Sequence, residues 1–196
     1  MAARWWYLRR GVPWPALLGC CAAALVLAGL LGRWPSSVLV LLPAVLACCA
    51  AAAGFVFDEP AGAVVAVTPR GAGWRRTTRL AVVLVPLVAW GAVVVVRPGD
   101  LPLDRAGWWL IGGAAVVLTS GLAARGSRRG VDSPGAALAS VVALVVLSPV
   151  VVTGFVGWDS VYPLSGFSAG TWAFWLVVGS GGMVAWWAAA RPGIRA

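Results

Sequence analysis

The chain has 196 residues, of which 61% are hydrophobic and 11% are charged, and its mean hydropathy is +0.92. This composition is too apolar to cover the chain with a water-compatible surface, so it excludes a soluble globular domain and predicts a membrane protein with several spans. All 15 basic residues are arginine, against six acidic residues, and lysine and histidine are both absent. The net charge of +9 is gathered in short links between apolar runs, so we expect no nucleic-acid partner.

Six apolar runs have the roughly 20 residues that a helix needs to cross a bilayer. Backbone groups in hydrocarbon must bond within their own segment, so we expect an all-α fold and one transmembrane domain over residues 1–196. The predicted spans are 13–32, 37–57, 79–97, 108–125, 134–155 and 171–190. Pro43, Pro86 and Pro149 fall inside three of them. The apolar stretch before Cys20 is short and broken by two prolines, so we expect a retained first span rather than a cleaved lipoprotein signal.

The arginines predict the orientation of the spans. Six spans place twelve arginines on one side: Arg4, Arg9, Arg10, Arg70, Arg75, Arg76, Arg79, Arg125, Arg128, Arg129, Arg191 and Arg195. The other side holds only Arg33, Arg97 and Arg105. Cytoplasmic links are enriched in basic residues, so both termini are predicted to be cytoplasmic. The bias toward Ala, Val, Gly, Arg and Trp is typical of a GC-rich bacterial genome, which makes the bacterial plasma membrane the expected location.

The longest link on the arginine-rich side, residues 58–78, is predicted from its sequence to contain a small apolar helix. Pro60 suits a first helical turn, with two acidic residues before it at the favourable end of the helix dipole. Pro69 should end the helix at the residue before it. Ala61, Val64, Val65 and Thr68 then share one face. This face needs either the membrane surface or a groove in a partner protein to cover it.

The stretches DEPAGAVVAVTP and WRRTTR in this link resemble the cytoplasmic link of ABC transporter permease subunits of the type-2 exporter class, particularly small actinobacterial ones. The resemblance implies six spans, a second permease subunit and a coupling helix seated on a cytoplasmic ATPase. The docking helix would be Ala61 to Val67, which includes Val64 and Val65, with Thr68 at its end before Pro69. Arg75, Arg76 and Arg79 would lie at the return of the link into the bilayer. The chain has no lysine and therefore no phosphate-binding G-x-x-x-x-G-K-[ST] loop, so we expect the ATPase to be a separate chain.

Residues 156–170, on the opposite side, are apolar and aromatic rather than polar, and they are punctuated by Gly, Pro and Ser. This pattern favours a re-entrant or interfacial segment, and the family that the link resembles has short re-entrant helices at this position. The alternative is a surface loop anchored by tryptophan.

The sequence offers little for catalysis or metal binding. Cys20 and Cys21 face Cys48 and Cys49 in adjacent spans, which would suit Cu(I) or a disulfide, but neighbouring helical residues point about 100° apart, so packing is the favoured interpretation. The six acidic residues fall at span ends or in links, which argues against a self-contained proton-coupled carrier. We therefore expect no enzyme activity, cofactor or metal. The alternative to a permease subunit is a non-transporting membrane scaffold or assembly protein.

Overall fold

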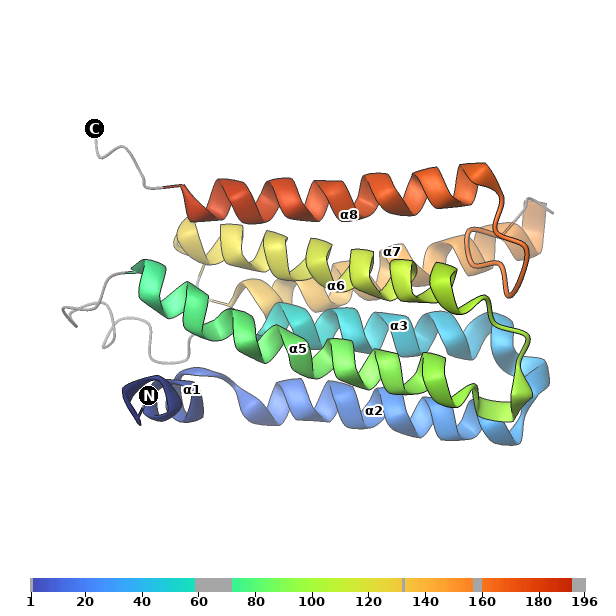
Figure 1. The fold of residues 1–196 in the computed structure, drawn as a ribbon, viewed down its shortest axis with the longest axis horizontal. Coiled ribbons are helices and arrows are strands. Elements are labelled where there is room, and N and C mark those ends of the chain that lie inside the picture. The colour runs from blue at the N-terminus through green and yellow to red at the C-terminus, as the bar shows by residue number, and fades with distance from the viewer. Residues whose placement is uncertain (1, 59–71, 132, 157–159, 192–196) are drawn as a thin grey trace.

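A computed structural model describes residues 2–58, 72–131, 133–156 and 160–191, and within them every regular element is a helix. These described residues form seven α-helices and two short 3-10 helices. Figure 1 shows how the helices are arranged. Their bounds are α1 Ala2–Gly11, α2 Trp14–Arg33, η1 Pro35–Ser37, α3 Val38–Phe55, α5 Ala72–Val96, η2 Pro98–Asp100, α6 Arg105–Arg128, α7 Pro134–Val156 and α8 Ala169–Ala190. The all-α prediction is confirmed.

Six of these elements are long and apolar enough to cross a membrane, which is the number of spans that the sequence predicts. The apolar segments are Trp14–Arg33, Pro35–Phe55, Thr77–Val96, Arg105–Arg128, Pro134–Val152 and Ala169–Ala190. The chain is a multi-pass membrane protein by the length and composition of these helices. Pro43, Pro86 and Pro149 lie inside α3, α5 and α7, as expected.

Helix α3 forms the centre of the bundle and packs against α2, α5, α6 and α7, while α8 packs along α6 (Figure 1). Two thirds of the α3 span is buried inside the bundle, against a small fraction of the α7 and α8 spans. Small residues at 47 and 49–54 line the buried surface of α3, which lets its neighbours approach closely. The remaining apolar surface of α7 and α8 is available to lipid.

Glycines mark two close helix crossings. A Cβ on Gly135 of α7 would lie 2.6 Å from the carbonyl carbon and oxygen of Gly54 on α3. A Cβ on Gly182 of α8 would lie 2.6 Å from the backbone nitrogen of Leu118 on α6. Backbone meets backbone at both crossings, so neither position has room for a larger residue.

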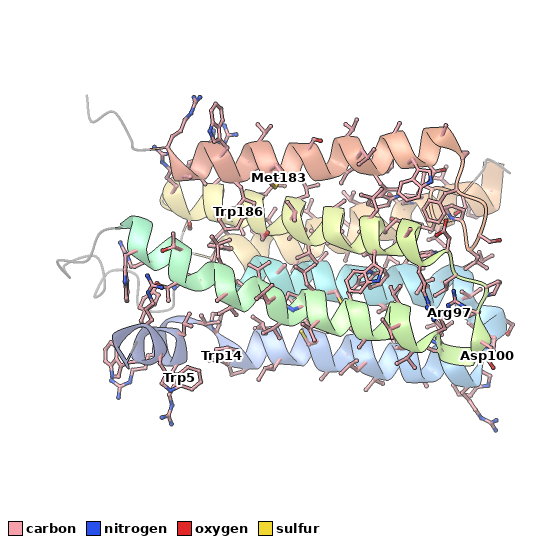
Figure 2. The ribbon with its side chains drawn as sticks, in the orientation of Figure 1. Trp5, Trp14, Arg97, Asp100, Met183 and Trp186 are labelled. Carbon is pink, nitrogen blue, oxygen red and sulfur yellow. The ribbon has the colours of Figure 1, made fainter. Side chains whose placement is uncertain are left out.

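The two ends of the bundle differ in charge. One end of the bundle carries α1 and the C-terminal ends of α6 and α8. The other end carries the links from α2 to α3 and from α5 to α6 (Figure 1). Figure 2 shows Trp5 and Trp14 near the first end and Arg97 and Asp100 at the second. The described arginines at the first end are Arg4, Arg9, Arg10, Arg75, Arg79, Arg125, Arg128, Arg129 and Arg191. We call it the arginine-rich end; its assignment to the cytoplasm stays a prediction.

Candidate functional site at the arginine-rich end

The predicted docking helix lies outside the described residues. This applies to Ala61, Val64, Val65, Val67 and Thr68, so their contact with an ATPase stays a prediction. The structure does describe both ends of the link that carries them. The link leaves the bundle after α3, at Asp58, and returns in the first turns of α5.

Arg79 occupies the centre of the site. Its side chain is only 3% exposed and turns into the bundle. Nε donates a hydrogen bond to the Tyr7 hydroxyl at 2.9 Å, and Nη2 donates to the Gly11 carbonyl at 2.7 Å. Nη1 donates to the carbonyls of Val56 and Asp58, both at 3.2 Å. The guanidinium carbon also lies 5.5 Å from the centre of the Tyr7 ring, within cation–π range.

The acceptors of Arg79 are available because two helices end there. Helix α1 ends at Gly11, and α3 ends at Phe55 in a turn that leads to Asp58. The last carbonyls of a helix have no intrahelical donor, and a helix C-terminus carries partial negative charge. A guanidinium satisfies several such carbonyls at once because its donors point in different directions from a planar fork. A single arginine therefore joins α1, α3 and α5.

The carboxylate of Asp58 extends the network to a fourth helix. It is 7% exposed and accepts hydrogen bonds from the backbone amides of Gly135 at 2.5 Å and Ala136 at 3.1 Å. These amides belong to the first turn of α7, which begins at Pro134 and needs an external acceptor. Burial raises the pKa of the Asp58 carboxyl, although the two amides and the charge of Arg79 act in the opposite direction.

We call Tyr7, Asp58 and Arg79 the polar junction. The sequence predicts Arg79 at the return of the link into the bilayer, and this stays a prediction; in the structure Arg79 lies on α5 with its side chain turned inward. Arg75 is half-buried on the same helix, and the side chain of Arg76 is not among those described. Asp58 was expected to lie at the N-terminus of the docking helix, at the favourable end of its dipole. In the structure its carboxylate accepts hydrogen bonds from the first turn of α7.

One sequence signal pointed to the inward position of Arg79. Val82 and Val83 follow it at helical spacing and are 3% and 7% exposed, so the three side chains share one face of α5. Nothing in the sequence indicated the partners of Arg79, because three of its four acceptors are backbone carbonyls. The partnership with Tyr7 joins residues 72 positions apart.

The four cysteines are free thiols: Cys21 and Cys49 are buried, and Cys20 and Cys48 are half-buried. In the part of the chain that the structure describes, no group of three or more His, Cys, Asp or Glu side chains could hold a metal ion. Cys49 and Cys21 belong to the buried apolar clusters that α3 and α2 form with their neighbours.

The segment 156–170 between α7 and α8 is described from residue 160 to 168, where it forms no helix. It folds back onto the end of the bundle opposite the arginines. Trp108 donates to the carbonyl of Pro163, and the backbone amide of Asp104 donates to the carbonyl of Leu164. The predicted re-entrant or interfacial position of the segment in a membrane stays a prediction.

No family model, curated protein or solved structure matches the chain.

Proposed function

We propose that the chain is a permease subunit of an ATP-driven ABC exporter and that the link 58–78 couples it to a separate cytoplasmic ATPase. The observation that carries the proposal is that both ends of this link enter one buried network. Asp58 lies at its exit from the bundle and Arg79 just past its return, and the carbonyl of Asp58 accepts a hydrogen bond from Arg79. A link fastened in this way can transmit a displacement to the bundle.

The contacts of the polar junction define which helices would respond. A displacement of the link acts on α3 and α5 through the backbone, on α1 through Tyr7 and Gly11, and on α7 through the cap on Gly135. Buried, fully bonded groups hold a fixed geometry, so the motion passes to whole helices rather than being absorbed by a loop. The bundle would thereby change access for an amphiphilic or lipid-like substrate.

In this proposal the chain forms the path of the substrate across the membrane and does not hydrolyse ATP. ATP hydrolysis belongs to the partner ATPase, and a second permease subunit, identical or related, completes the path. The excess of arginine at one end supports a cytoplasmic position for that end, with the chain in the bacterial plasma membrane. This orientation puts the link 58–78 on the side where ATP is present.

Copurification with the ATPase encoded beside this chain tests the proposal. We expect the native chain to retain the ATPase and the double variant Val64→Asp, Val65→Asp to lose it, because two carboxylates prevent burial of an apolar helix face. The matched control is Val131→Asp, an exposed valine in the link between α6 and α7. It lies at the same end of the bundle and should retain the ATPase.

Equal retention by the native chain and the double variant would contradict the docking assignment. Loss of the ATPase in both variants would show that added charge, rather than the docking face, disrupts the complex. Failure of the native chain to retain any ATPase would favour the scaffold alternative.

A further inference from the structure

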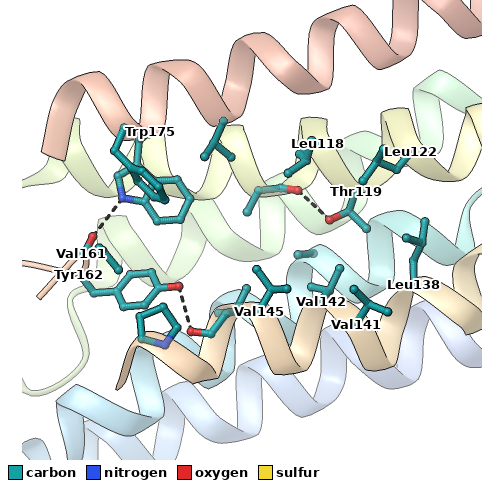
Figure 3. Close-up of a pocket in the computed structure, with 16 residues that line it drawn as sticks. Leu118, Thr119, Leu122, Leu138, Val141, Val142, Val145, Val161, Tyr162 and Trp175 are labelled. Carbon is teal, nitrogen blue, oxygen red and sulfur yellow. Dashed lines mark hydrogen bonds between the residues drawn. The ribbon is translucent and has the colours of Figure 1, made fainter. Parts of the chain in front are cut away.

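An apolar cavity of about 210 Å³ lies between α7 and α8, with α6 and α3 behind it (Figure 3). Along α7 it extends from Leu138 to Pro149. Val142 and Val146 line it from α7, Leu118 lines it from α6, and Val178 lines it from α8. It is separate from the polar junction, whose three residues are not among those that line it.

The described residues that line the cavity offer it no free polar group. The Thr119 hydroxyl donates to the carbonyl of Ala115 at 2.9 Å, and the Tyr162 hydroxyl donates to the carbonyl of Val146 at 2.9 Å (Figure 3). The remaining lining side chains are hydrocarbon apart from the Trp175 indole, whose N–H donates to the carbonyl of Val161. A water molecule needs two to four polar partners, so the cavity excludes water and any polar ligand.

The mouth of the cavity opens toward lipid. Helices α7 and α8 have no extended contact with each other, and Val141, Val145 and Phe174 at the rim are exposed. Leu144, on the outer face of α7 between these valines, is 72% exposed. These residues belong to the spans of α7 and α8, so the mouth lies at hydrocarbon depth in a bilayer.

The link between α7 and α8 closes one end of the cavity. Its Val161 and Tyr162 are bonded to α8 and α7 respectively, through the Trp175 indole and the Val146 carbonyl. Pro149 lies at the same end and lines the cavity. An occupant therefore reaches the cavity sideways, from the bilayer, rather than through this end.

We propose that the cavity holds part of one acyl chain of a membrane lipid. A second helix, about 10 Å across, is too wide for 210 Å³, and a dry apolar cavity of roughly 150 Å³ is known to hold benzene. An empty cavity would forfeit the dispersion contacts of its walls, whereas a narrow hydrocarbon chain restores them. This site does not depend on the proposed transport role, and loss of ATPase binding would leave it standing.

Photochemical labelling tests the site. The chain is reconstituted in phosphatidylcholine vesicles that contain a phosphatidylcholine with a diazirine in its acyl chain, irradiated, digested and mapped by mass spectrometry. We expect adducts on Val146 and Leu118 inside the cavity as well as on exposed Leu144. Val142→Trp fills the cavity and should lower the adducts on Val146 and Leu118 about tenfold, because apolar pockets discriminate strongly by volume.

Leu144→Trp is the matched control, since it adds the same indole to the outer face of the same helix. It should leave the adducts inside the cavity unchanged. Adducts confined to Leu144 in the native chain, or labelling of Val146 that Val142→Trp does not change, would overturn the proposal. Ala115→Val fills the cavity from α6 and provides the same comparison if the larger substitution prevents folding.

Discussion

Replacing Arg79 by methionine removes the guanidinium of the polar junction while keeping an unbranched side chain of similar reach. The substitution leaves the carbonyls of Gly11, Val56 and Asp58 without their donor in a site where Arg79 itself is 3% exposed. The Tyr7 hydroxyl loses its partner as well. The network that joins α1, α3 and α5 is thereby broken at its centre.

The expected loss of stability follows from these contacts. Hydrogen bonds to a charged group contribute about 1.5 to 3 kcal/mol each, but relief of the buried charge offsets part of the four bonds lost. The four acceptors are neutral oxygens, and leaving a buried acceptor without its donor costs about 1 to 3 kcal/mol, so after relief of the buried charge we expect Arg79→Met to lower the free energy of unfolding by about 3 kcal/mol. Arg79→Lys should cost less, since it keeps the charge, but one ammonium cannot reproduce the geometry of the fork.

The cysteines provide the assay. Cys21 and Cys49 are buried in α2 and α3, so a thiol-reactive dye reports their exposure as the bundle unfolds. The free energy of unfolding is measured by titrating the chain in mild detergent micelles with sodium dodecyl sulfate at constant temperature. Arg9→Met is the control, because Arg9 is an exposed arginine at the same end of the bundle. It removes the same charge and should change the free energy of unfolding by no more than about 0.5 kcal/mol.

Two results would refute this account of the polar junction. One is an Arg79→Met variant whose free energy of unfolding equals that of the native chain. The other is an equal loss in Arg9→Met, which would show that charge at this end matters and the hydrogen bonds do not.

Three further predictions concern other parts of the molecule. Gly135→Ala should lower the free energy of unfolding by about 1 to 3 kcal/mol because its Cβ meets the Gly54 backbone, whereas Gly19→Ala, with no atom within 4 Å of its Cβ, should be neutral or stabilising in the same titration. Burial raises the pKa of Asp58 above its usual 3.8, so the folded state binds this proton more tightly than the unfolded state. Stability should therefore fall as the pH rises from 3.8 through the raised pKa, and Asp58→Asn should flatten the measured profile in that window. Tyr162→Phe removes one bond between the outer link and α7, worth about 1 kcal/mol, and should speed hydrogen exchange in residues 160–168.

The six spans could be predicted because the bilayer imposes both a length and an apolar composition, and each run met both conditions. The helix boundaries were less predictable. Helix α5 begins at Ala72 rather than near residue 79, because its first turns carry Trp74, Arg75 and Arg76 and do not count as apolar. A helix ends where its hydrogen bonding ends, and hydropathy measures only the preference for lipid.

The polar junction could be anticipated only in part. The helical spacing of Arg79 with Val82 and Val83 is a signal from which an inward arginine could have been predicted. Its partners could not, because backbone carbonyls are present at every position and cannot be recognised in a sequence. The carboxylate of Asp58 suits a helix N-terminus, and the sequence predicts that it lies at the N-terminus of the docking helix that follows it in the chain. In the structure it caps the N-terminus of α7, because glycine at positions 54 and 135 brings the ends of α3 and α7 together.

The cap that Asp58 places on α7 has a consequence for biogenesis. The carboxylate and the Gly135 amide are separated by 77 residues, so about two fifths of the chain is synthesised between them. In a nascent chain that ends before α7, the Asp58 carboxylate lacks the amides that donate to it in the folded protein. The amides in the first turn of α7 likewise lack this acceptor until α7 meets α3. Docking of α7 against the end of α3 brings the Asp58 carboxylate to these amides, so assembly of the bundle supplies the protein acceptor for the first turn of the fifth span.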